Sequence, residues 1–129
     1  MIDHIGLSVA DYLMSKAFYD AVMPTLGAAC AMVVTPEETG GTYEGAGYGV
    51  NGKPSLWIGT GGRTQGSVHV AFVADSRTAV DAFYAAAMAA GARDNGPPGI
   101  RTDYHPGYYA AFVLDPDGHN IEAVCQKPA

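Results

Sequence analysis

Hydrophobic and polar residues alternate over residues 2–9, a period that predicts a β-strand with one apolar face and one polar face. The apolar face is formed by Ile5, Leu7 and Val9, and the opposite face by His4, Gly6 and Ser8. Over residues 12–26 the apolar positions recur at helical spacing instead, with Asp11 as the expected N-cap and Gly27 as the end. We expect the apolar stripe of this helix to cover the apolar face of the sheet.

Shorter patterns complete the first half of the chain. Residues 30–34 form a short apolar run, and residues 43–50 and 55–60 flank Asn51-Gly52, a dipeptide typical of tight hairpin turns. The glycine-rich stretch Gly59–Gly66 is interpreted as a linker. A phosphate-binding loop is the weaker interpretation, because the stretch has no Gly-Lys-Ser/Thr sequence and no helix follows it directly.

The second half repeats this plan. A strand is predicted over residues 68–74, followed by a helix that Asp75 or Ser76 caps and that reaches about Ala90 before Gly91 ends it. The final apolar runs, residues 108–114 and 119–124, flank Asp115-Pro116-Asp117-Gly118. Proline and glycine at these positions predict a tight turn between antiparallel strands.

The two halves are copies of one unit. A shift of 65 residues, the separation of His4 from His69, also carries Phe18-Tyr19 onto Phe83-Tyr84 and Trp57 onto Glu122. Each copy is a strand, a helix and further strands. We expect one domain over residues 1–129, with a first module at about residues 1–62 and a second at about residues 66–129.

Four of the matched positions share one side of the predicted sheet. By strand parity His4, His69, Glu122 and Trp57 all lie opposite the faces assigned to the helices. Their small neighbours leave room for a ligand on this concave side. Glu122 needs a partner there, because an unpaired carboxylate in the middle of a buried strand is costly.

Two histidines and one carboxylate form a three-ligand site with open coordination positions. Such a site suits Fe(II), Mn(II), Zn(II) or Ni(II), and the open positions allow a metal to polarise an oxygen or activate water. A metal-free alternative pairs Glu122 with a protonated histidine. In that alternative Trp57 lines an aromatic pocket for a flat or cationic ligand.

Composition limits the possible partners. The 129 residues carry a net charge of −6 without a Lys/Arg cluster, which argues against nucleic acid and anionic membrane surfaces. No stretch approaches the roughly 20 apolar residues that cross a bilayer. The two cysteines, Cys30 and Cys125, and the absence of an apolar leader favour a cytoplasmic protein with reduced thiols. Both cysteines are expected to be buried.

Three motifs together identify a family resemblance. They are Asp3-His4-Ile5-Gly6-Leu7-Ser8-Val9-Ala10-Asp11 with Phe18-Tyr19, then Val68-His69-Val70-Ala71-Phe72, and the closing Asp115-Pro116-Asp117-Gly118-His119-Asn120-Ile121-Glu122. This pattern resembles the vicinal oxygen chelate superfamily, which includes glyoxalase I, bleomycin resistance proteins and extradiol dioxygenases. The resemblance implies an α+β fold of two βαβββ modules forming a cupped mixed sheet, commonly a homodimer with a divalent metal in the cup. It places His4, His69 and Glu122 at metal-ligand positions.

One departure from the family pattern changes the expected chemistry. Glyoxalase I has a glutamate, used as a ligand and in proton transfer, where this chain has Trp57, so the resemblance is closer to the dioxygenases or the fosfomycin-modifying branch. Extradiol dioxygenases also use a histidine and a tyrosine near the metal, and His105 and Tyr109 are the catalytic candidates. Trp57, Arg101 and Tyr104 are candidates for substrate binding, with Arg101 able to hold a carboxylate. The loop over residues 95–107 is either a binding lid or a rigid surface loop.

Two functions follow as hypotheses. The first is a small metal-dependent enzyme, a lyase, isomerase or dioxygenase, acting on a small oxygen-chelating substrate. The second is a metal-free binding protein of the bleomycin-resistance type in which Trp57 and tyrosines stack on the ligand. A structural dimer with a vestigial cup is the third alternative.

Overall fold

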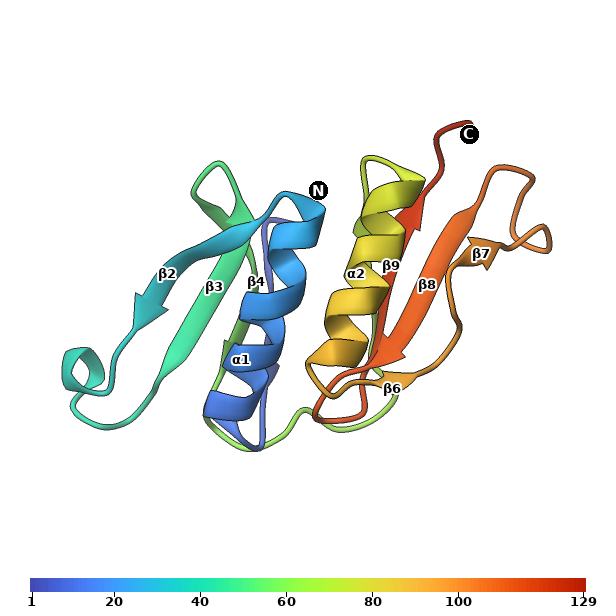
Figure 1. Cartoon of the computed structure of the whole chain (residues 1–129). Helices are drawn as coiled ribbons and strands as arrows, with labels where there is room; N and C mark the ends of the chain where they lie inside the picture. Colours follow the sequence, from blue (N-terminus) through green and yellow to red (C-terminus); the bar gives the residue numbers. More distant parts are fainter.

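The computed structural model describes residues 1–129 and divides the chain into two sheets, each with one helix packed against it (Figure 1). The first module contains β1 (Ile5–Ser8), α1 (Tyr12–Val22), η1 (Met23–Leu26), β2 (Ala29–Val34), η2 (Glu37–Thr39), β3 (Gly45–Val50) and β4 (Lys53–Gly59). The second contains β5 (His69–Val73), α2 (Arg77–Ala89), β6 (Arg93–Asp94), β7 (Gly99–Ile100), β8 (Tyr109–Leu114) and β9 (Asn120–Cys125). Neither helix has the length and hydrophobicity that a membrane crossing requires.

The backbone pairing repeats between the two sheets. The strand orders are β1-β4-β3-β2 and β5-β9-β8-β6, with β7 as a further short partner of β8. Gly6 pairs with Trp57 in the first sheet, and Ala71 pairs with Glu122 in the second, which is the same register after the 65-residue shift. The mixed α+β fold with two βαβββ modules is therefore confirmed.

The helices begin where the sequence predicts. The side chains of Asp11 and Ser76 accept hydrogen bonds from backbone N–H groups in the first turns of α1 and α2. The first helix ends earlier than expected, at Val22, and continues as the 3-10 turn η1. Pro24 explains the change, since it has no N–H to donate to an α-helical hydrogen bond. Gly27, with φ of 75°, then ends η1.

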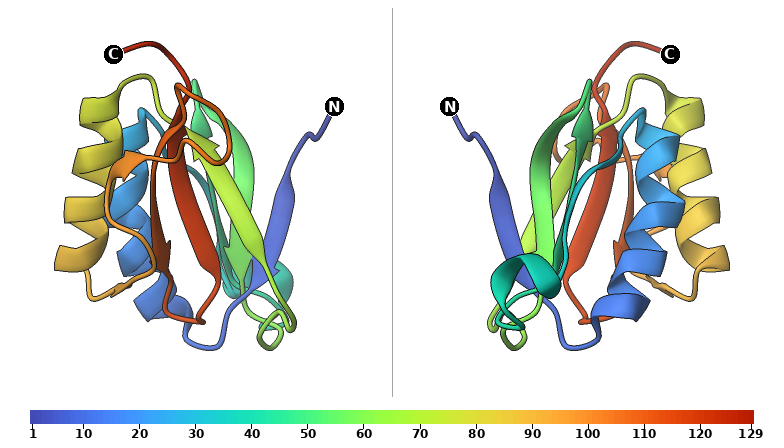
Figure 2. Two further views of the ribbon diagram at one scale, coloured as in Figure 1. Left: turned by 90° about the vertical axis from the view of Figure 1, so that its right-hand side faces the viewer. Right: turned by 90° about the vertical axis from the view of Figure 1, so that its left-hand side faces the viewer.

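The main core lies between the helices and the sheets. Figure 2 shows α1 and α2 together on one side of the strands, with β1 on the side away from them. The largest buried apolar and aromatic side chains of this core are Phe18, Tyr19, Tyr48, Leu56, Ile58, Phe83 and Ile121. The opposite face of each sheet, called the concave face below, is the face to which strand parity assigns the candidate site residues.

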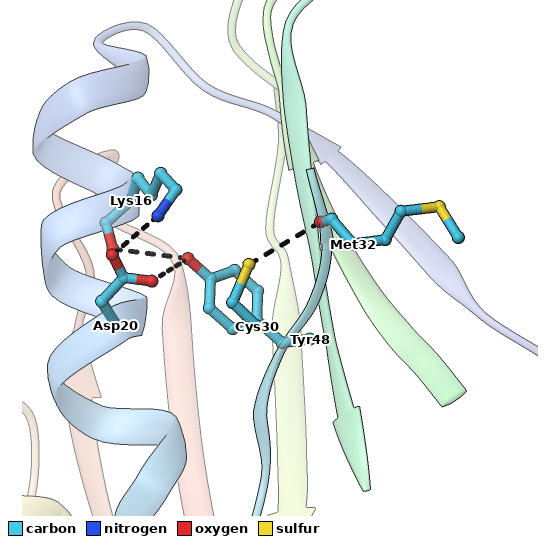
Figure 3. A network of polar contacts seen from close by, with 5 residues as sticks. All are labelled: Lys16, Asp20, Cys30, Met32 and Tyr48. Carbon is cyan, nitrogen blue, oxygen red and sulfur yellow. Dashed lines mark hydrogen bonds and ion pairs between the residues drawn. The ribbon is translucent and has the colours of Figure 1, made fainter. Parts of the chain in front are cut away.

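A polar network attaches β3 to the first helix (Figure 3). The buried hydroxyl of Tyr48 donates a hydrogen bond of 2.8 Å to Asp20, which also accepts one of 2.9 Å from Lys16. Burial and the hydrogen bond to Asp20 raise the pKa of Tyr48 well above its ordinary value.

The expected burial of Cys30 is wrong, since this residue is exposed on the edge strand β2 whereas Cys125 is buried.

The turn between β8 and β9 connects the two modules. Asp115, only 3% exposed, accepts hydrogen bonds from the backbone N–H groups of Asp117 and His119, both at 2.9 Å. Its second oxygen accepts a bond of 2.7 Å from the hydroxyl of Tyr19 on α1. Asp117 accepts a bond of 3.1 Å from the N–H of Ala10. The last hairpin is therefore held against the start of the first helix.

We predict that Asp115→Asn lowers the free energy of unfolding by about 2 kcal/mol, because the neutral amide loses the charge that strengthens the bonds from the two backbone N–H groups and the Tyr19 hydroxyl. Urea denaturation followed by circular dichroism measures the change. Asp103→Asn is the matched control, because Asp103 is exposed and takes part in no hydrogen bond or ion pair. Equal stability of the two variants would show that the Asp115 carboxylate does not hold this turn.

Candidate functional site

The parallel neighbours β5 and β9 bring His69 and Glu122 together on the concave face of the second sheet. Nε2 of His69 lies 2.8 Å from Oε1 of Glu122. The glutamate side chain is 1% exposed, whereas the histidine side chain is 52% exposed. A buried carboxylate thus contacts an imidazole that solvent or a ligand can reach, which agrees with the requirement for a partner at Glu122.

Tyr108 completes this arrangement, and the sequence reasoning did not select it. Its hydroxyl donates a hydrogen bond of 2.5 Å to Oε2 of Glu122. Burial raises the pKa of Tyr108 to about 12, with a further contribution from the bond to Glu122. The phenol therefore remains a neutral donor at physiological pH. The repeat contained a usable signal, because the 65-residue shift carries Tyr43 onto Tyr108.

The catalytic candidate Tyr109 lies on the other face of the same strand. Its hydroxyl donates a bond of 2.6 Å to Asp81 on α2, and this bond raises the pKa of Tyr109. Successive residues of a strand point to opposite faces, so Tyr108 and Tyr109 cannot both face Glu122. The structure does not bring Tyr109 to the site.

Arg101 lies over the concave face of the second sheet. Its guanidinium is 5.4 Å from the centre of the Phe112 ring and donates a bond of 2.6 Å to the carbonyl of Pro97. Phe112 pairs directly with Glu122 across β8 and β9. The arginine therefore places a positive charge on the face that holds the carboxylate.

His105 and Tyr104 pack on Tyr108. The two rings meet the Tyr108 ring edge to face, with centroids 5.3 and 4.9 Å away. Nε2 of His105 lies 2.5 Å from the side-chain oxygen of Gln126. The loop of residues 95–107 that carries them is held against β8 by the short strand β7, and β6 holds the residues just before it. These side chains surround the phenol that binds Glu122 and do not themselves bond the carboxylate.

His4 and Trp57 belong to the first sheet. His4 is exposed, and its Nδ1 lies 2.6 Å from Asp3. No three His, Cys, Asp or Glu side chains of the chain are placed so that they could hold one metal ion. The reason is topological, because β1 pairs only with β4 and β5 only with β9. Trp57 is half-buried on the concave face of the first sheet.

The donor types at His69 and Glu122 fit a divalent metal. An imidazole nitrogen and a carboxylate oxygen are ligands that Fe, Mn, Zn and Ni accept. Tyr108 occupies the second oxygen of Glu122, which leaves Oε1 for a metal together with His69. One chain thus brings together two of the three residues that the sequence suggests as ligands.

The comparison with protein families gives the same assignment as the fold. Residues 1–123 match the model of the Glyoxalase/Bleomycin resistance protein/Dioxygenase superfamily. The chain belongs to this superfamily. No curated protein sequence matches it at a significant level.

Solved structures support the membership. A glyoxalase/bleomycin resistance protein from Albidiferax ferrireducens is 30% identical, with a TM-score of 0.68 over 98% of each chain. Glyoxalase I from Zea mays is 20% identical, with a TM-score of 0.72 over 99% of this chain and 45% of that one. A mutant of the fosfomycin resistance protein FosX from Listeria monocytogenes, in complex with Mn(II) and a dihydroxypropylphosphonic acid, is 22% identical. Its TM-score is 0.69 over 95% of this chain and 90% of that one, and the last two likenesses show the fold alone.

We predict that the phenol of Tyr108 titrates near pH 12. The difference in phenolate absorbance between wild type and Tyr108→Phe, read after a rapid pH jump, should show one group with this midpoint. Since the folded-state pKa lies above the unfolded value of about 10, the stabilising contribution of this phenol is complete below pH 10. The contribution is lost as the pH rises through about 12. Tyr109→Phe should leave this step in place, and a midpoint near 10 would contradict the burial of Tyr108.

Proposed function

We propose that this protein is a metal-dependent enzyme of the superfamily whose centre is formed by His69 and Glu122 of one chain and His4 of a second copy. The observation that carries the proposal is the contact of 2.8 Å between His69 and Glu122 on the concave face. The imidazole of His69 and the carboxylate of Glu122 are both ordinary metal ligands, and one side of the imidazole is open to solvent. FosX, a relative of the same fold, was solved with Mn(II) and a diol ligand.

The free strand edges favour a second copy as the source of His4. Each of β1 and β5 pairs on one side only, so each presents a row of unpaired backbone groups that can template another strand. Val73 at the end of β5 is 77% exposed, an apolar side chain at that free edge. Pairing β1 of one copy beside β5 of the other would bring His4 to the His69 side of the cup. We therefore propose a homodimer with two shared sites.

The chain's own residues have distinct roles in the proposed centre. A bound divalent metal would act as a Lewis acid toward vicinal oxygens of a small substrate. Tyr108 holds Glu122 by one oxygen and, as a neutral phenol, adds no charge to the site. Arg101 offers a cation for an anionic substrate group on the same face. His105, whose ring packs edge to face on that of Tyr108, is the candidate for general acid or base chemistry.

The metal-free binding protein is the second candidate function. Glu122 already has two partners in His69 and Tyr108, so a protonated imidazole alone could satisfy the carboxylate. In this alternative Trp57 contributes the ligand contact, and no ion is required. The two functions differ in whether the protein takes up metal.

We predict about one divalent metal per chain when the protein is purified without chelators or a His tag and then loaded with Fe(II), Mn(II), Zn(II) or Ni(II). Elemental analysis measures the stoichiometry. His69→Ala and Glu122→Gln should each lose the stoichiometric metal, because each removes a proposed direct ligand. His105→Ala removes an imidazole outside the proposed ligand set and should retain the metal. No uptake of any of the four ions by the wild type would exclude the metal-dependent enzyme.

A mixing experiment tests whether the site is shared. His4→Ala and His69→Ala homodimers should each lack metal, because both of their sites have lost one ligand. In a mixed dimer one site has lost both histidines while the other retains His4, His69 and Glu122, so metal should return to about half of the mixed-dimer sites. Mixed dimers isolated through two different affinity tags, neither containing histidine, give the measurement. No recovery would show that the histidines do not act across a dimer.

A further inference from the structure

The imidazole of His4 is held by a carboxylate that is itself held by a lysine. Nδ1 of His4 lies 2.6 Å from Oδ1 of Asp3. Nζ of Lys53, the first residue of β4, lies 2.9 Å from the same oxygen. Adjacent residues of a regular strand point to opposite faces, but β1 starts only at Ile5, so this alternation does not separate Asp3 from His4. The carboxylate therefore connects the imidazole to the neighbouring strand β4.

This contact determines which nitrogen of His4 carries the proton. An ionised carboxylate can only accept hydrogen bonds, so Nδ1 is the donor to Asp3. In a neutral imidazole the other nitrogen, Nε2, then keeps a free lone pair, which is the form that binds a metal. The His4 side chain is 57% exposed, and its hydrogen bond within the chain is made through Nδ1. Nε2 is therefore left for a group outside the chain.

The second module has no counterpart of this arrangement. The 65-residue shift carries Asp3 onto Val68 and Lys53 onto Gly118, neither of which has a charged side chain. His69 meets its own carboxylate, that of Glu122, through Nε2 rather than Nδ1. The two histidines that the repeat equates are thus held through opposite nitrogens, and the contact with an adjacent aspartate belongs to the first module alone.

We propose that Asp3 is a positioning residue, which holds the proton of His4 on Nδ1 and leaves Nε2 free to bind the metal. The inference deepens the proposed function and rests on it for the metal itself. A carboxylate that accepts the second N–H of a ligating histidine fixes the orientation of the ring and raises the basicity of the ligand. Exposed ion pairs contribute little to folding stability, so the effect of Asp3 is expected on the imidazole and on metal affinity instead.

The first test measures the position of the proton in the metal-free protein, in EDTA at about pH 9, where imidazole rings are neutral. Long-range ¹⁵N–¹H correlation spectra distinguish a protonated ring nitrogen from a bare one, and His4→Gln identifies the signals of His4. We expect the proton on Nδ1 in the wild type. In Asp3→Ala it should move to Nε2, the form that a free histidine side chain prefers in water. A wild-type proton on Nε2, or the same form in both proteins, would overturn the inference.

The second test measures binding of Mn(II) and Ni(II) by calorimetry. Asp3→Ala should weaken it by about tenfold to a hundredfold, the usual effect of removing the partner of a ligating histidine. Asp103→Ala is the matched control, because it removes an exposed carboxylate without a hydrogen bond or ion pair and changes the net charge equally. Circular dichroism of both variants verifies the fold. Equal metal affinities of the two folded variants would overturn the inference.

Failure of the proposed function would be recognised in the wild type. If the wild type takes up no divalent metal, the metal-dependent enzyme is excluded, and the proton position in wild type and Asp3→Ala alone decides whether Asp3 controls His4. If the wild type binds metal and Asp3→Ala binds it equally well, the enzyme remains and the positioning role of Asp3 is excluded.

Discussion

The carboxylate of Asp115 is the interaction on which the position of the candidate site depends. It closes the turn before β9 through two backbone N–H groups and attaches that turn to α1 through the hydroxyl of Tyr19. The strand that carries Glu122 starts only a few residues later, so the turn fixes both its register and its face. A one-residue slip would point Glu122 into the main core. The same carboxylate thus joins the modules and orients the glutamate.

The two modules share a backbone and differ in how they fill the concave face. In the first sheet a large ring at Trp57 lies over Gly47, and in the second the smaller Glu122 lies opposite the large Phe112. The larger side chain of the pair lies on β4 in the first sheet and on β8 in the second, while the register is the same. The same backbone thus carries an indole on the concave face of one sheet and a carboxylate on that of the other.

The sequence predicted the repeat, the helix caps and the meeting of His69 with Glu122, because local periodicity and strand parity determine each of them. It did not select Tyr108 over Tyr109, since the choice depends on one residue of parity at the start of β8. The sequence could not predict where His4 lies relative to His69 and Glu122. This position depends on how the two sheets pack, within one chain or between two, and the pattern of a single strand does not encode packing.

The burial of Glu122 determines how this centre can work. Its carboxylate would be unstable at 1% exposure without donors, and His69 and Tyr108 provide them in the single chain. In the proposed centre a metal would take the place of the His69 contact at Oε1, while Tyr108 would keep its bond to Oε2. Because these partners already orient the carboxylate, binding would cost little side-chain entropy. The pair of His69 and Glu122, which stabilises the buried carboxylate in the single chain, would therefore also set the affinity of the proposed site.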